Sequence, residues 1–141
     1  MRTVVMLTFV LAGALTQTTT VKMTAPPDVA APPADALKTA SGLASKVITG
    51  GTGKIHPTPS NHITVNYTGW TTDGRMFDSS IPQGQPVTLP LNRLIAGWTE
   101  GLQLMVVGET RRLWIPEPLA YRGEREPKGM LVFDVELVNI E

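Results

Sequence analysis

Cysteine is absent from this chain of 141 residues, so the sequence can form neither a disulfide scaffold nor a thiolate metal site. An excess of charge is also lacking, because 12 basic and 12 acidic residues cancel at neutral pH. Without a basic block, nucleic acid is not an expected partner. Neither a Ser/His/Asp arrangement nor a phosphate-binding loop stands out. His56 and His62 have no clustered acids beside them, so we expect structural residues rather than metal ligands.

The length allows one domain plus a tail. Met1 and Arg2 precede a mostly apolar stretch from Val4 to Leu15, which is typical of a secretory signal peptide and too short and broken for a membrane-spanning helix. We therefore expect residues 1–20 to be a signal peptide or apolar N-terminal segment, with export to the periplasm or the extracellular space. The alternative is an uncleaved apolar tail of a cytoplasmic protein. The lack of cysteine is compatible with either compartment.

Residues 21–37 are expected to form a Pro/Ala-rich linker ahead of a domain at 38–141. Pairs of prolines at 26–27 and 32–33 remove backbone donors and favour extended conformations. Such a segment is typical of a semi-rigid spacer with no core of its own. The domain that starts near Lys38 is therefore expected to fold without it.

Alternating apolar and polar residues predict extended segments at residues 43–49, 63–67, 75–78, 86–91, 110–116 and 131–137. Asp73-Gly74 predicts a hairpin turn. Trp98, Leu102 and Met105 fall at i, i+4 and i+7, the spacing of one face of a short helix. Strands with one short helix closing over a sheet face indicate an α+β fold.

Aromatic residues make up only 6% of the chain, yet several lie where the chain is expected to change direction. This placement favours a concavity lined by rings, and an apolar pocket with a few polar groups is the default site for a small ligand. The stretches involved are NYTGW (66–70), GRMFDSS (74–80), IAGWTEGLQLMVVG (95–108), RRLWIPEPLAY (111–121) and MLVFDVELVNIE (130–141).

In this order and spacing, the five stretches resemble the FKBP-type peptidyl-prolyl cis-trans isomerases over roughly Leu43 to Glu141. The resemblance implies a twisted, mostly antiparallel β half-barrel wrapped around one short helix. It also implies a cofactor-free, metal-free isomerase that acts on Pro-containing unfolded or flexible polypeptides, and it leaves macrolide-type ligands open as a second ligand class. The alternative is a non-catalytic binding module of the same fold for Pro-containing segments.

The resemblance also implies roles for individual residues. Catalytic roles fall on Tyr67, Asp78, the backbone N–H of Ile95, and Tyr121; substrate-binding roles fall on Phe77, Val87, Leu94, Trp98 and Phe133. The alternative for each aromatic strand residue is a plain core position, and for Tyr121 a place in a surface loop. Phe77 and Asp78 are neighbours, so the strand must bulge or end there if both contact the site.

Three departures from the family pattern affect the expected site. Val87 and Leu89 stand where aromatic residues are usual, which predicts a wider slot on that side. Gln83 stands where an arginine usually pairs with Asp78, so that carboxylate needs backbone amides, Tyr67 or a displaced arginine as its partner. The loop at residues 122–129 is shorter than usual and charged, and the resemblance implies that this loop shapes substrate choice.

Overall fold

The computed structural model describes residues 19–141, so nearly all of the expected signal segment lies outside the described residues. Within these residues, one α-helix, α2 (Ala96–Leu102), accompanies three short 3-10 turns, η1 (Ile81–Gln83), η2 (Leu91–Arg93) and η3 (Glu117–Leu119). The strands are β1 (Leu37–Lys38), β2 (Ala44–Thr49), β3 (His62–Thr71), β4 (Met76–Ser79), β5 (Val87–Pro90), β6 (Thr110–Ile115) and β7 (Leu131–Ile140). No helix among the described residues has the length and apolarity that crossing a membrane requires.

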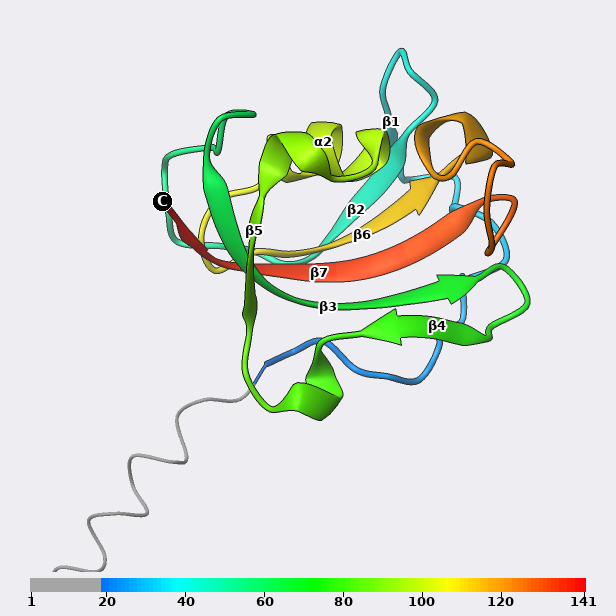
Figure 1. Cartoon of the computed structure of the whole chain (residues 1–141), viewed down its shortest axis with the longest axis horizontal. Coiled ribbons are helices and arrows are strands. Elements are labelled where there is room, and N and C mark those ends of the chain that lie inside the picture. The colour runs from blue at the N-terminus through cyan, green and yellow to red at the C-terminus, as the bar shows by residue number, and fades with distance from the viewer. Residues whose placement is uncertain (1–18) are drawn as a thin grey trace, which may run out of the picture.

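The strands form one antiparallel sheet in the order β1-β2-β6-β7-β3-β4, and β5 pairs with β3 off that path. Figure 1 shows this sheet curving beneath α2, with β5 crossing over the sheet at one end. The predicted half-barrel around one short helix is therefore confirmed. The helix ends earlier than the spacing suggested, because Met105 lies beyond its last turn.

Period-2 alternation on the central strands creates two apolar faces. On β6 and β7, Leu113 and Phe133 belong to the large core cluster, together with Trp98 and Leu102 of the helix. Their neighbours Trp114 and Val132 belong instead to a second cluster, which includes Trp70 and Ala44. Because successive side chains of a strand point to opposite faces, one face packs on α2 and the other needs a separate cover.

Residues 19–36 provide that cover, and Figure 1 shows this blue segment running past the sheet on the side away from α2. The indole nitrogens of Trp70 and Trp114 donate hydrogen bonds to the backbone oxygens of Met23 at 3.0 Å and Asp28 at 2.9 Å. Val21 is only 4% exposed. This segment was expected to be a semi-rigid spacer with no core of its own; long-range contacts hold the coil on the sheet, and we call it the N-terminal arm.

Two arginines of β6 carry the ion pairs of this region. Arg112 contacts both oxygens of Asp134 on β7, at 2.6 and 2.8 Å, and reaches Asp28 of the N-terminal arm at 3.0 Å. Arg111 is 8% exposed and pairs with Glu109 at 2.6 Å. Buried charges require such partners, and both arginines are salt-bridge donors rather than part of a solvated strand face.

Candidate functional site

A cavity of about 120 Å³ opens between α2 and the sheet, and we call it the slot. At ~30 Å³ per water molecule, this is space for one small ring. Its lining includes seven of the residues implied by the resemblance, together with Leu89: Tyr67, Asp78, Leu94, Ile95, Trp98, Tyr121 and Phe133. The sequence therefore predicted most of the residues that the fold brings together here.

Aromatic rings form the buried end of the slot. Trp98, from the first turn of α2, is 4% exposed. Tyr67 and Phe133 pack edge-on against its indole, with ring centroids at 5.2 and 5.3 Å and interplanar angles of 87° and 88°. Such T-shaped pairs are favoured by the ring quadrupoles and hold the rings in fixed orientations. The indole nitrogen of Trp98 is buried without an acceptor among the described residues.

Strand β4 has a β-bulge at Phe77, next to Asp78. Gly69 of β3 pairs with Asp78 and the next residue, Trp70, pairs with Met76, so Phe77 is the extra residue on β4. The strand therefore bulges between these two neighbours, although only Asp78 lines the slot. Phe77 lies behind the slot rather than in its lining, packed edge-on against Phe133 at 5.5 Å.

Asp78 finds its partner in Tyr67, whose hydroxyl donates to a carboxylate oxygen at 2.9 Å. Asp78 is exposed, so no displaced arginine is needed to compensate for burial. Burial, and then the hydrogen bond and negative charge of Asp78, raise the pKa of Tyr67 well above its ordinary value. The Tyr67 hydroxyl therefore stays protonated at neutral pH and keeps its orientation toward Asp78.

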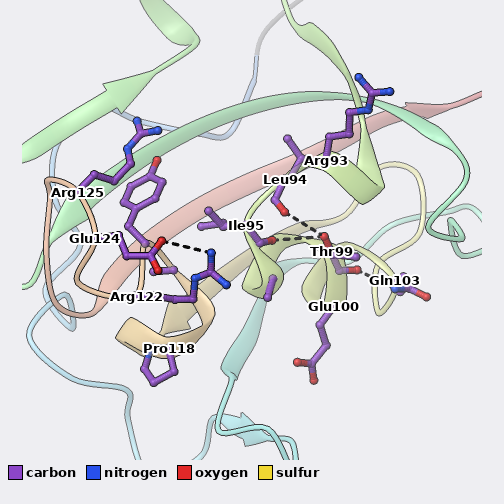
Figure 2. Close-up of a pocket in the computed structure, with 13 residues that line it drawn as sticks. Arg93, Leu94, Ile95, Thr99, Glu100, Gln103, Pro118, Arg122, Glu124 and Arg125 are labelled. Carbon is purple, nitrogen blue, oxygen red and sulfur yellow. Dashed lines mark hydrogen bonds and ion pairs between the residues drawn. The ribbon is translucent and has the colours of Figure 1, made fainter.

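Leu94 and Ile95 form the side of the slot next to the helix, in the short link between η2 and α2. The Thr99 hydroxyl lies against this link and donates to the Leu91 carbonyl at 3.0 Å, and Figure 2 shows it facing the carbonyls of Leu94 and Ile95 as well. The Ile95 N–H precedes the helix and makes no hydrogen bond within residues 19–141. Thr99 is thus a positioning residue that the sequence motifs did not single out.

Val87 is not part of the slot lining, whereas Leu89 is. Both lie on β5, where Val87 pairs with Val65 and Leu89 with Ile63 of β3. Both side chains are half-buried and pack against the core, but only Leu89 reaches the cavity. Of the two departures from the family pattern on β5, only Leu89 therefore borders the slot, and it was not among the expected binding residues.

Gly69 is a second residue that the sequence analysis missed. A Cβ atom there would lie 2.6 Å from Cε2 of Phe133 and 3.0 Å from Cζ of Phe77. Only glycine lets the two rings pack directly on the β3 backbone. A glycine in the interior of a strand is a known sign of such close approach, and here it lies inside the NYTGW stretch.

No group of three or more His, Asp or Glu side chains gathers in a metal-binding arrangement within residues 19–141. The slot instead offers an aromatic floor, a backbone donor and two phenolic hydroxyls. These groups can hold a small apolar ring and contact the polar atoms next to it.

Comparison with known proteins agrees with this geometry. The family model for FKBP-type peptidyl-prolyl cis-trans isomerase matches residues 53–138. The isomerase FkpA of Aeromonas hydrophila is 48% identical over 107 residues, covering 73% of this chain. A peptidyl-prolyl cis-trans isomerase of Schizosaccharomyces pombe is 41% identical over 106 residues, covering 70% of this chain and 95% of its own.

Among solved structures, FkpA from Escherichia coli superposes with a TM-score of 0.71 at 37% identity, over 77% of this chain and 53% of that one. The chain spans only about 40% of the length of the Aeromonas relative. Sequence, fold and site geometry together establish that this chain belongs to the FKBP-type peptidyl-prolyl cis-trans isomerase family.

Proposed function

We propose that this protein is a peptidyl-prolyl cis-trans isomerase that accelerates rotation about Xaa-Pro bonds in unfolded or flexible polypeptides. The two isomers of such a bond differ by only about 0.5–1 kcal/mol, but a barrier of about 18–20 kcal/mol separates them. No covalent bond breaks during the rotation. A catalyst therefore needs only to bind the twisted amide better than the planar one.

The slot has the parts that this task requires. The proline ring lies on Trp98, between Phe133 and Leu89. The free N–H of Ile95 donates to a substrate carbonyl, and the Tyr121 hydroxyl at the mouth is a second donor. Surrounded by apolar groups, the amide loses contact with water, and water stabilises the planar, charge-separated form more than the twisted form. Tyr67 and Asp78 hold each other in place on the wall opposite the helix.

One observation carries the proposal: a ring-sized aromatic cavity lies beside a backbone N–H with no partner among the described residues. The alternative is a non-catalytic module that binds Pro-containing segments with the same slot. It is favoured by Leu89 on the widened side and by the short charged loop after Tyr121. Both functions use the same cavity, so only a measurement of catalysed Xaa-Pro isomerisation can distinguish the isomerase from the binding module.

The test is a proline-limited refolding assay with the purified full chain, compared with Tyr121→Phe and Thr99→Val. An isomerase speeds the slow phase in proportion to its concentration. Tyr121→Phe should lower kcat with little change in stability, because it removes a donor at the cavity mouth. Thr99→Val should lower kcat by loosening the Leu94–Ile95 link. A wild-type protein that binds proline peptides but leaves the slow phase unchanged is the non-catalytic module.

We further propose export, based on the apolar stretch that follows Arg2. The proposal requires residues 1–20 to direct a fused reporter out of the cytoplasm. A reporter enzyme that works only after translocation would report export, and a fusion in which Val4–Leu15 carries two added aspartates is the control. Activity from neither fusion would overturn the proposal of export, and equal activity from both would show that the apolar stretch is not the export signal.

A further inference from the structure

A second, wider cavity of about 940 Å³ continues from the slot, and we call it the side cavity. Leu94, Ile95 and Tyr121 line both spaces, so a chain that leaves the slot enters the side cavity directly. Three residues of the loop at 122–129 are among its lining residues, namely Arg122, Glu124 and Arg125. The side cavity is therefore placed to hold a substrate residue next to the proline.

The two arginines are held on a braced loop. Arg122 has a left-handed backbone, with φ of 58°, and its N–H donates to the carbonyl of Glu117 at 2.9 Å. The carboxylate of the same Glu117 accepts the N–H of Gly129 at 2.8 Å, which ties the far end of the loop to its start. A left-handed backbone is uncommon for a residue with a side chain. These hydrogen bonds hold the backbone of the loop, and so fix the positions from which the side chains of Arg122 and Arg125 extend.

Arg125 has its guanidinium carbon 4.4 Å from the centre of the Tyr121 ring, the spacing of a cation–π contact. It has no carboxylate partner among the ion pairs of residues 19–141. It therefore brings an uncompensated positive charge to the ring that separates the slot from the side cavity.

Figure 2 shows the guanidinium of Arg122 turned into the side cavity, toward Ile95. Its partner there is Glu124, at 3.3 Å, and both side chains are about two-thirds exposed, at 66% and 67%. Such exposed pairs are weak, so a carboxylate from a ligand can replace Glu124. The other acid of the lining, Glu100, accepts the Ser41 hydroxyl at 2.6 Å.

We propose that the side cavity is a subsite for an acidic side chain within two residues of the substrate proline, read by Arg125 and Arg122. The ligand class is thus an Asp- or Glu-containing Xaa-Pro segment. This inference rests on the proposed isomerase function, whose slot supplies the anchor for the proline. It adds a charge preference that an aromatic slot by itself does not have.

The test measures kcat/KM on a set of proline peptides in which each of the two positions before and after the proline is Glu, Gln or Lys. At one of these positions we expect Glu to exceed Gln by about two- to fivefold at low salt, the range of a partly exposed ion pair. The preference should shrink in 0.5 M salt, where the Debye length is only about 3–8 Å.

Arg125→Gln and Arg122→Gln should each reduce the Glu-over-Gln ratio toward one, with turnover of the Gln peptide kept. Lys128→Gln is the matched control, because it makes the same charge change in the same loop and Lys128 does not line the side cavity. A ratio that falls equally in the control would show a general field effect and overturn the assignment to this subsite.

Direct binding of the same peptides, followed by fluorescence anisotropy of a labelled end, separates this inference from the proposed function. Catalysis without a Glu preference overturns the inference and leaves the isomerase. Tighter binding of the Glu peptide without catalysis overturns the isomerase and supports the subsite. Equal weak binding and no catalysis overturn both.

Discussion

Gly69→Ala tests whether the slot depends on direct contact between two aromatic rings and the backbone of β3. The added Cβ would lie 2.6 Å from Cε2 of Phe133 and 3.0 Å from Cζ of Phe77, whereas carbon atoms prefer to be about 3.5–4.0 Å apart. Phe133 must therefore move by about 1 Å. Trp98 and Tyr67 back its ring, with centroids at 5.3 and 6.4 Å, so the displacement reaches the slot.

The change in the free energy of unfolding for Gly69→Ala is the difference between two opposing effects. Overpacking a well-packed core typically costs about 1–3 kcal/mol, and replacing glycine by alanine returns about 0.4–1 kcal/mol by restricting the unfolded chain. The net loss, at most about 2.6 kcal/mol, should lower the melting temperature by up to roughly 10 °C. Activity should fall further, because misplacing reacting groups by about 1 Å can reduce the rate about 100-fold.

The assays are thermal unfolding and proline-limited refolding, with Gly50→Ala as the control because a Cβ there meets nothing within 4 Å. Phe133→Leu makes room for the new methyl group, so Gly69→Ala should cost less stability in that background than in the wild type, as a double-mutant cycle measures. If Gly69→Ala keeps wild-type stability and activity, or if its cost is unchanged beside Phe133→Leu, the slot does not depend on this contact.

Trp98→Ala should lower the unfolding free energy by about 3–5 kcal/mol and abolish peptide binding, while Trp98→Phe keeps a ring, removes the unpaired N–H and should cost far less in urea unfolding. The raised pKa of Tyr67 means that its contribution to stability is complete below about pH 10 and is lost as the pH rises through the folded-state pKa. Tyr67→Phe should therefore flatten the alkaline side of the stability–pH curve, and an unchanged curve would contradict this. A chain that begins at Lys38 should be about 2–4 kcal/mol less stable than one that begins at Thr19, and equal denaturant midpoints would show that the N-terminal arm adds nothing. Leu89→Phe should lower KM for proline peptides, whereas Val87→Phe should change stability alone; the opposite pattern in steady-state kinetics would place Val87 in the slot.

The sequence predicted the parts of this fold that depend on local periodicity. Alternation along residues 131–137 predicted the strand that is observed as β7, and Asp73-Gly74 predicted the turn between β3 and β4. The strands and the turn share a cause, because each is a repeat or an offset that can be read within a few residues. Most of the slot lining was instead implied by the family resemblance, which extends over about a hundred residues.

What the sequence did not predict depends on distances between segments. The N-terminal arm has the composition of a spacer, and it packs because two tryptophans far along the chain offer indole donors to its carbonyls. Likewise, the position of β5 across β3 in the folded chain puts Leu89, and not Val87, in the lining of the slot. Neither the packing of the N-terminal arm nor the placement of Leu89 can be recognised from a pattern in the neighbouring sequence.

Strand β7 contributes residues to both faces of the sheet, one bordering the slot and the other covered by the N-terminal arm. Phe133 forms a wall of the slot. The next residue, Asp134, accepts two hydrogen bonds from Arg112, and Arg112 donates a third to Asp28 of the N-terminal arm. Since Arg112 satisfies two carboxylates at once, releasing the N-terminal arm would leave Asp134 as its only acidic partner and uncover the rings of Trp70 and Trp114. The backbone that carries Phe133 is thus braced from the opposite face. The N-terminal arm has the composition of a linker, but its contacts make it part of the structure that supports the slot.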